Sequence, residues 1–309
     1  MKYAATIGFF DGVHKGHQYL LDELRRVAKE HCLQSAVLTL DEHPEFILTG
    51  HAKPLLTTGQ EREHLLKQSG VDEIFMFHFS VIQQMTAAEF MQIIHDRCGV
   101  EVLLIGYDHH FGSDQPSSFS DYEQLGAEMG LTVLPVSQSP EGDVSSSKIR
   151  KALKEGDIER ANAMLGYNYI LSGPVVRGNG IGHTIGFPTA NIAVDACKLI
   201  PKPGVYAAEG AVVNIGTNPT IGNDHLTVEA YLIDYQGDEL YGQNLTLRLT
   251  HRIRDERKFN NMDELKAQIQ RDLDTVMTWS GTEQKPSRNR AGTEQKPSRN
   301  RAETDLGRR

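Results

Sequence analysis

The stretch GFFDGVHKGH, residues 8–17, combines residue types that can bind phosphate. Its two histidines, His14 and His17, can donate hydrogen bonds to phosphoryl oxygens. The stretch lies where a predicted strand (4–10) gives way to a predicted helix (17–31), and a helix N-terminus offers unpaired N–H groups and a partial positive charge. Three glycines let the backbone approach a ligand closely: Gly8, Gly12 and Gly16. The pattern therefore predicts a phosphate site at a strand-to-helix junction.

Two other interpretations fit the same histidines. They could be surface residues that happen to fall near a helix start. They could also be half of a zinc site that His109 and His110 complete, since zinc needs three or four ligands. The dense glycine setting favours phosphate over both alternatives.

A second stretch, residues 173–192, reads GPVVRGNGIGHTIGFPTANI. Its glycines allow a loop to close over phosphates: Gly178, Gly180, Gly182 and Gly186. Thr189 and Asn191 alternate on an extended segment, so both can face one Mg²⁺ ion, which prefers hard oxygen ligands. The alternative is the polar edge of a strand.

Glu229 interrupts the apolar strand VEAYLI. The period of two places Val228, Ala230 and Leu232 on one face of this strand and Glu229 on the other. An unpaired carboxylate in such a place is costly, so Glu229 is either half of a structural salt bridge or a functional group.

The order of the predicted elements indicates two domains. The first half alternates apolar runs with helical patterns, which predicts an α/β domain of Rossmann-like type, with a parallel sheet wrapped by helices. Two short helices follow, at 147–155 and 158–165. From about Tyr169 the pattern predicts an antiparallel β-barrel that ends with a helix at 262–277. We place the domains at 1–158 and 159–280, with a disordered tail at 281–309.

The tail repeats GTEQKPSRNRA in tandem and has no apolar residue larger than alanine before Leu306. It carries a net charge of +4, so the remainder of the −9 chain is at −13, which argues against a nucleic-acid binder. No apolar run is long enough to cross a membrane, and the start resembles no signal peptide. The three cysteines form no CxxC, so we expect a cytoplasmic protein. We also expect a monomer or a weak homo-oligomer.

GFFDGVHKGH resembles the HxGH signature of nucleotidyltransferases. Together with GYDHHFG (106–112) and SSSKIR (145–150), it is similar to the first domain of the bacterial bifunctional riboflavin kinase/FMN adenylyltransferases. The resemblance implies that His14 and His17 grip the phosphates of ATP and that Arg150 faces the departing pyrophosphate. The implied nucleotide-binding residues are Gly8, Phe10, Asp11, Gly12, Asp108, Ser145, Ser146 and Ser147. One of these serines could be only a helix cap, and Asp11 could equally cap the helix.

One loop departs from that family's pattern. The family usually has LTFxPHP after the second strand, whereas this chain has LTLDEHP at 38–44, with Glu42 in place of the proline before the histidine. The change could weaken adenylylation.

TIGFPTAN resembles the PTAN motif of riboflavin kinases. The resemblance implies that Glu229 is the general base that activates the primary alcohol of riboflavin, and that Thr189 and Asn191 hold Mg²⁺. It implies ATP contacts at Gly178, Gly182, Thr184, Pro188, Thr189 and Tyr206. Arg254 and Phe259 would contact the flavin, although packing or salt-bridge roles fit both equally.

The expected function is therefore synthesis of FMN from riboflavin and ATP, then of FAD from FMN and ATP, with Mg²⁺. One alternative is a nucleotidyltransferase for another phosphate-bearing substrate, which would not need the second motif. A second alternative is a flavin-binding protein without catalysis, which would not need the catalytic residue types.

Overall fold

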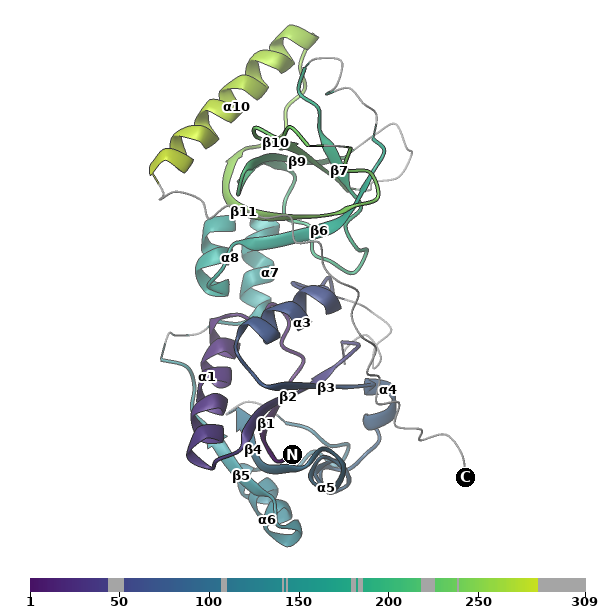
Figure 1. Ribbon diagram of the computed structural model, residues 1–309, viewed down its shortest axis with the longest axis vertical. Coiled ribbons are helices and arrows are strands. Elements are labelled where there is room, and N and C mark those ends of the chain that lie inside the picture. Colours follow the sequence, from purple (N-terminus) through teal and green to yellow (C-terminus); the bar gives the residue numbers. More distant parts are fainter. Residues whose placement is uncertain are drawn as a thin grey trace.

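The computed structural model describes residues 1–43, 53–106, 110–140, 142, 144–178, 182, 186–217, 226–237 and 239–282. These residues form a parallel-sheet domain and a closed barrel, with two helices between them (Figure 1). None of the described helices combines the length and the apolar character needed to cross a bilayer.

The first domain is a five-stranded parallel sheet with the strand order β3-β2-β1-β4-β5. Its strands are β1 (Tyr3–Ile7), β2 (Gln34–Leu40), β3 (Glu73–Phe77), β4 (Val100–Gly106) and β5 (Thr132–Val136). Its helices are α1 (Lys15–Glu30), α3 (Gly59–Gln68), α4 (Phe79–Ile82), α5 (Ala87–Cys98) and α6 (Phe119–Met129). From β1 the chain adds β2 and β3 on one side of the sheet and then β4 and β5 on the other, so the strand order changes direction between β1 and β4. Ligands of such sheets bind at the carboxyl ends of the strands at this point.

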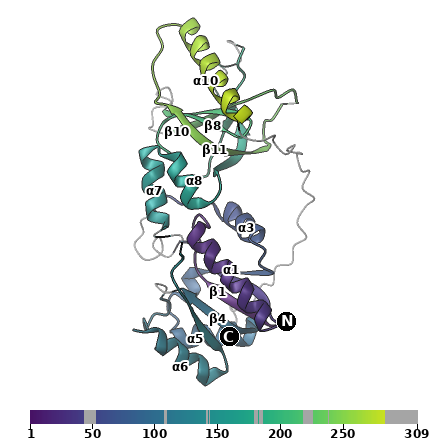
Figure 2. The ribbon, with the colours of Figure 1, turned by 90° about the vertical axis from the view of Figure 1, so that its left-hand side faces the viewer.

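Helices cover both faces of the sheet (Figure 2). Tyr3, Ala5 and Ile7 of β1 pack with residues of α5 on one face, whereas Ala4 packs with residues of α1 and α3 on the other. Every residue of β1 is buried, as expected for a central parallel strand. The sheet therefore provides a rigid base for the loop that follows β1.

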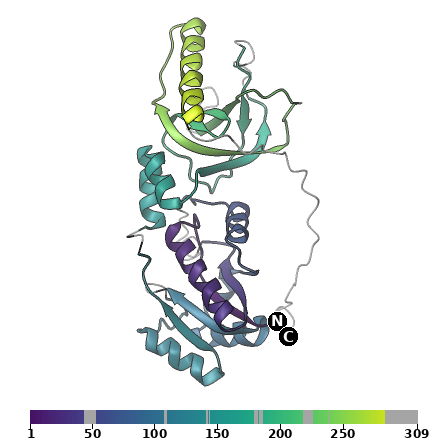
Figure 3. The same ribbon diagram turned by 60° about the vertical axis from the view of Figure 1, so that its left-hand side comes forward.

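The second domain is a closed antiparallel barrel with the strand order β10-β7-β6-β11-β8-β9. Its strands are β6 (Tyr169–Val176), β7 (Ala190–Ile192), β8 (Gly204–Ala208), β9 (Ala211–Thr217), β10 (Leu226–Leu232) and β11 (Asn244–Arg254). Alternate residues fill the interior, and helix α10 (Met262–Thr282) packs on the outside against Val205, Ala207 and Val212 (Figure 3). The predicted fold class is confirmed for both domains.

Several predicted elements differ in their limits, and the strand expected at 4–10 is observed as β1 with its end at Ile7. Helix α1 begins at Lys15 because the side chain of His14 caps it, and α10 runs to Thr282, since no glycine or proline interrupts it before Gly281. The strand expected at 227–235 is observed as β10, which stops at Leu232, two residues before Asp234, whose φ of 55° breaks the extended conformation. The alternation of leucines with polar residues predicts a strand over 244–250, and β11 continues four residues further, to Arg254.

Helices α7 (Ser146–Glu155) and α8 (Ile158–Leu165) lie between the two domains (Figure 1). Ile149 and Leu153 of α7 belong to the same hydrophobic cluster as Leu56 of the first domain and Tyr169 of the barrel. The domain limits stay a prediction, because this cluster runs across them.

A buried ion pair also joins the domains. The Nζ of Lys198, whose side chain is fully buried, lies 2.6 Å from Oε2 of Glu61 and also donates to the carbonyl of Leu56. Glu61 accepts a further bond from Ser172 Oγ at 2.6 Å, and it caps α3 through the N–H of Thr58. The carboxylate is thus fully satisfied, as a buried charge requires.

We expect Lys198→Met to lower the free energy of unfolding by about 3–5 kcal/mol, because it leaves the buried Glu61 carboxylate without its cation. Urea denaturation measures the loss. Adding Glu61→Gln should restore part of the stability by removing the unpaired charge. The control is Lys151→Met, which breaks an exposed pair with Glu155 and should cost under about 1 kcal/mol. Equal effects of Lys198→Met and Lys151→Met would contradict the expectation.

Candidate functional sites

The loop between β1 and α1 has an unusual backbone. Phe10, Gly12 and Val13 have positive φ angles of 57°, 83° and 36°. For a residue with a Cβ this conformation costs about 1–2 kcal/mol, so the surroundings must hold Phe10 and Val13 in place. Gly12 also needs to lack a side chain, because a Cβ there would lie 2.9 Å from Leu56.

Asp11 anchors this loop. Its carboxylate, which is 4% exposed, accepts hydrogen bonds from the N–H groups of Leu56 at 2.9 Å and Thr57 at 3.0 Å. It also forms an ion pair with Arg150, whose Nε donates to the carbonyl of Pro54. Asp11 therefore does not cap α1, whose N-cap is His14, and its predicted contact with the nucleotide stays a prediction.

The same contacts change the interpretation of Arg150. Its guanidinium is largely buried and binds Asp11 and Pro54, so the described geometry gives it partners other than the predicted pyrophosphate. It connects α7 to the loop after β1 and to the segment before α3.

His14 and His17 stack on each other, with ring centroids 3.7 Å apart and an angle of 13° between the planes. His14 is the N-cap of α1, and its Nδ1 accepts the N–H of His17 at 3.4 Å. Burial lowers the pKa of His14 to about 4, although the carboxylate of Asp11 acts in the opposite direction. His14 is therefore neutral at pH 7 and carries its proton on Nε2, which makes it a donor.

The neighbouring predicted residues shape this pair. The ring of Phe10 meets the ring of His17 edge-on at 5.2 Å. Gly8 and Gly16 pack closely against the rings of Phe10 and His14, with 3.1 and 3.2 Å between an added Cβ and the nearest ring atoms. Gly8 and Gly16 thus leave room for aromatic rings, whereas Gly12 allows the positive φ angle of the loop.

The three serines divide into different roles. Ser145 is the N-cap of α7 and accepts the N–H of Lys148. Ser146 donates to the carbonyl of Asp11 at 2.9 Å, and Ser147 is exposed in the first turn of α7. The bond from Ser146 brings the N-terminus of α7 beside that of α1, and two converging helix N-termini favour an anion.

Two further predicted residues of this domain cannot be placed. Asp108 and His109 lie outside the described residues. Within the part of the chain that the structure describes, no group of three or more His, Cys, Asp or Glu side chains could hold a metal ion.

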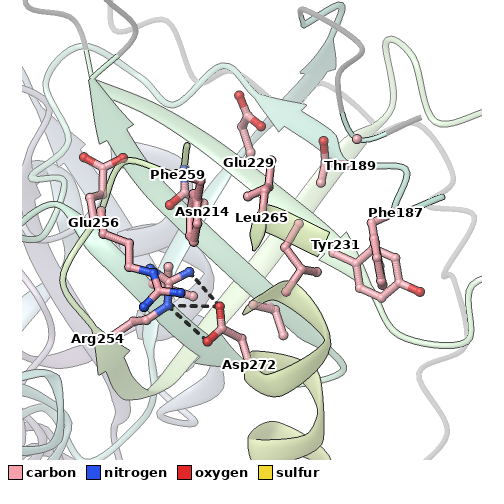
Figure 4. Close-up of a pocket in the computed structure, with 15 residues that line it drawn as sticks. Phe187, Thr189, Asn214, Glu229, Tyr231, Arg254, Glu256, Phe259, Leu265 and Asp272 are labelled. Carbon is pink, nitrogen blue, oxygen red and sulfur yellow. Dashed lines mark hydrogen bonds and ion pairs between the residues drawn. The ribbon is translucent and has the colours of Figure 1, made fainter. Parts of the chain in front are cut away.

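The second site is a cavity of about 310 Å³ between the barrel and α10 (Figure 4). Five predicted residues line it: Gly182, Thr189, Glu229, Arg254 and Phe259. Apolar side chains of Phe187 and Tyr231 form part of its wall. Such a mixture of apolar walls and a few polar groups is typical of sites for small molecules.

Glu229 lies in the middle of β10, directly opposite Asn191 of β7 and Asn214 of β9. Burial raises the pKa of its carboxyl group. Among the described residues no lysine, arginine or histidine pairs with it, so the salt-bridge alternative has no support. The strand register thus places Glu229 between Asn191 and Asn214 of the neighbouring strands, and Thr189 lines the same cavity as Glu229 and Asn214 (Figure 4).

Arg254 and Phe259 close one side of the cavity. Arg254 forms a two-pronged ion pair with Asp272 of α10, with 2.7 Å between Nη2 and Oδ2 (Figure 4). Phe259 lies beneath the guanidinium of Arg257, 4.7 Å from ring centroid to Cζ. Arg254 therefore forms the salt bridge that was one of its two predicted roles, and this ion pair attaches α10 to the barrel.

The other predicted residues of the barrel lie elsewhere. Tyr206 points into the barrel, where its hydroxyl donates to the carbonyl of Lys202, because its neighbour Val205 takes the outward position on β8. Tyr206 is therefore not part of the lining of this cavity, and its predicted contact with ATP stays a prediction. Pro188 is exposed, and Thr184 lies outside the described residues.

Two residues that contact the loop of the first site were not predicted from the sequence. Thr57 accepts the N–H of Gly12 through its hydroxyl, and Tyr167 donates its phenol proton to the carbonyl of Gly12. They are 45 and 155 positions away from the residue that they hold, so no local pattern includes them.

Comparison with known proteins agrees with this division. A family model described as FAD synthetase matches residues 1–149, and one described as riboflavin kinase matches residues 165–280. A bifunctional riboflavin kinase/FMN adenylyltransferase of Listeria monocytogenes is 34% identical over 280 residues, which cover 86% of this chain and 89% of the relative. The protein of the same name from Escherichia coli K12 is 35% identical, with 89% of this chain and 92% of the relative covered.

A solved structure has the same overall arrangement. A crystal structure named as a macrolide-efflux protein from Streptococcus pneumoniae is 30% identical and has a TM-score of 0.79. The similarity covers 90% of this chain and 95% of that one, so it includes both domains.

A parallel-sheet domain with paired histidines at a helix start, joined to a barrel with a half-buried carboxylate, defines a two-domain protein of nucleotide-dependent group transfer. The chain belongs to the family of bifunctional riboflavin kinase/FMN adenylyltransferases. The predicted family, enzyme class and pair of activities are confirmed.

Gly178 offers a test of the barrel site. A Cβ at Gly178 would lie 2.1 Å from Nδ2 of Asn191, so Gly178→Ala must displace that amide. We expect the rate of FMN formation to fall by about 10²-fold, whereas FAD formation from added FMN stays unchanged. The control is Gly59→Ala, whose Cβ meets open space. Unimpaired FMN formation by Gly178→Ala would show that the position of Asn191 does not matter for phosphorylation.

Proposed function

We propose that this chain, a bifunctional riboflavin kinase and FMN adenylyltransferase, phosphorylates riboflavin in the cavity beneath α10 and adenylylates FMN beside His14 and His17. The observation that carries the kinase assignment is Glu229, a carboxylate with a raised pKa in the wall of a cavity. The adenylylation assignment rests on the stacked pair of His14 and His17 at the start of α1, in which burial lowers the pKa of His14 to about 4.

For adenylylation the phosphate of FMN is the nucleophile and needs no general base. Its oxygen attacks the α-phosphorus of ATP, the bond to the β-phosphate oxygen breaks, and pyrophosphate leaves. The work of the protein is positioning and stabilisation of charge. His14 donates from Nε2 to a phosphate oxygen, and His17, stacked on it, donates to the phosphates as well. The N-termini of α1 and α7 add their N–H groups and partial charge.

In this proposal Arg150 acts through the loop. It holds Asp11, and Asp11 holds the backbone that carries the histidines. Its charge still favours anions nearby, but the contacts of its Nε and Nη2 are structural.

For phosphorylation the nucleophile is a neutral primary alcohol, so a base is useful. Glu229 takes the proton as the alcohol oxygen attacks the γ-phosphorus of ATP and ADP leaves. The raised pKa brings the carboxylate closer to the range in which a base is effective. Phe187 and Tyr231 offer the apolar contact surface that a flavin ring requires.

The oxygens of Thr189 and Asn191 fit Mg²⁺, because both are hard ligands and both lie beside the carboxylate of Glu229. When bound, the ion would neutralise charge on the phosphates of ATP. The proposal also includes a cytoplasmic protein that is a monomer or weak homo-oligomer and binds small molecules rather than nucleic acid. The strongly acidic body and the three free cysteines support this part.

Two substitutions should separate the activities. Glu229→Gln should lower FMN formation by about 10²–10⁴-fold, and His17→Asn should lower FAD formation from FMN by about 10²–10³-fold. Each variant should keep the other activity. Chromatography of the flavins after incubation with ATP and Mg²⁺ measures both products.

Matched controls are Glu239→Gln, an exposed carboxylate of the barrel, and His31→Asn, at the exposed C-terminal end of α1. Both should behave like the original protein. A folded variant that lost both activities through either site substitution would refute the assignment of two separate sites.

The raised pKa of Glu229 also has a consequence for stability. The folded state holds this proton more tightly than the unfolded state, so stability falls as pH rises from about 4.5 through the raised pKa. Glu229→Gln removes this loss. Its melting temperature should therefore exceed that of the original protein at pH 8, and the difference should shrink at pH 4. A difference that is constant over this range would indicate that burial does not perturb the carboxyl group.

A further inference from the structure

Three successive carbonyl groups of the loop before α1 each accept a side-chain hydrogen bond. Ser146 Oγ donates to Asp11 at 2.9 Å, and Gln18 Nε2 donates to Val13 at 2.8 Å. Between them, the phenol of Tyr167 donates to Gly12 at 2.6 Å. One local donor, Gln18, and two donors from distant parts of the chain, Ser146 and Tyr167, thus fix a loop that local geometry does not favour.

Tyr167 comes from the kinase half of the chain. It follows α8 and lies within the segment that the riboflavin kinase model matches. Gln18 reaches toward the same region, because its amide also donates to the carbonyl of Leu165 at 2.9 Å. The start of the second domain therefore holds the loop at Gly12 directly and at Val13 through Gln18.

The phenol remains a donor over the useful pH range. Burial raises the pKa of Tyr167 well above its usual value, and the nearby carboxylates of Glu61 and Asp11 act in the same direction. The ring packs partly against the clusters of both domains.

The held carbonyl lies two residues before His14. His14 is the N-cap of α1 and stacks on His17. The orientation of both imidazoles therefore depends on the backbone conformation of the loop that leads into α1. A released Gly12 carbonyl would let the residues with positive φ on either side of it relax.

We infer that Tyr167 is a positioning residue for FMN adenylylation: its hydroxyl, supplied by the kinase half of the chain, fixes the Gly12 carbonyl and thereby the orientation of His14 and His17. The inference rests on the proposed function of these two histidines. It means that the FAD-forming site is complete only when the start of the second domain is docked on the first.

Tyr167→Phe in the full chain tests this inference, because it removes only the hydroxyl. We expect kcat for FAD formation from FMN to fall about tenfold, with KM for FMN and ATP changed less than about twofold. Riboflavin phosphorylation should be unchanged. The control is Tyr169→Phe, which removes a buried hydroxyl that donates to the carbonyl of Leu199 at 2.7 Å, away from the loop. It should leave both activities as they are.

A second measurement reports on the imidazole itself. Because burial lowers the pKa of His14 to about 4, a loop that loosens and admits water should raise it toward the ordinary value of 6.5. NMR titration of the histidine ring nitrogens should show this rise in Tyr167→Phe and not in Tyr169→Phe.

The outcomes separate this inference from the proposed function. If His17→Asn abolishes FAD formation but Tyr167→Phe leaves kcat and the pKa of His14 unchanged, only the role of Tyr167 is wrong. If His17→Asn leaves FAD formation intact, the proposed function itself fails. Loss of both activities or of folding in Tyr167→Phe would overturn the inference, since the hydroxyl would then have a general structural role.

Discussion

One buried carboxylate, Asp11, connects the parts of the first domain on which its chemistry depends. It accepts hydrogen bonds from the backbone of Leu56 and Thr57 and pairs with Arg150, so it joins the loop after β1, the segment before α3 and the helix α7. A carboxylate at this depth is stable only with such partners. The loop can therefore hold an unfavourable backbone, and the histidines that follow it inherit a fixed orientation.

The fold was largely predictable because it depends on periodicity. Alternating apolar runs and helical patterns predicted the parallel sheet, and a period of two predicted the barrel. The same period predicted that Glu229 lies on one face of its strand and that Val228 and Ala230 lie on the other face. This prediction is confirmed, because Val228 and Ala230 fill the barrel whereas Glu229 lines the cavity. Limits of elements were less predictable, since an imidazole is an unusual helix cap and the sequence gives no sign that His14 acts as one.

The barrel motifs predicted that Thr189, Glu229, Arg254 and Phe259 belong together, and these residues do line one cavity. The partners of single residues were not predictable. Arg150 and Asp11 have the chemistry of ligand-binding groups, and only the tertiary structure shows that they bind each other across 139 positions. Tyr206 lies on the inner side of β8, a choice of face that the short motif GVYA does not determine. Long-range contacts of this kind decide whether a polar side chain faces a ligand or supports the residue that does.

The hydrophobic cluster that includes Leu56, Ile149 and the barrel interior has a consequence for the separation of the two domains. Two domains that meet only through polar surface can be joined or separated by a change in the linker alone. Here, separation would expose Leu56 and Leu199 to water and would divide Lys198 from Glu61. A change in the linker alone would therefore not suffice to separate these two domains, because the core residues that they share would have to change as well.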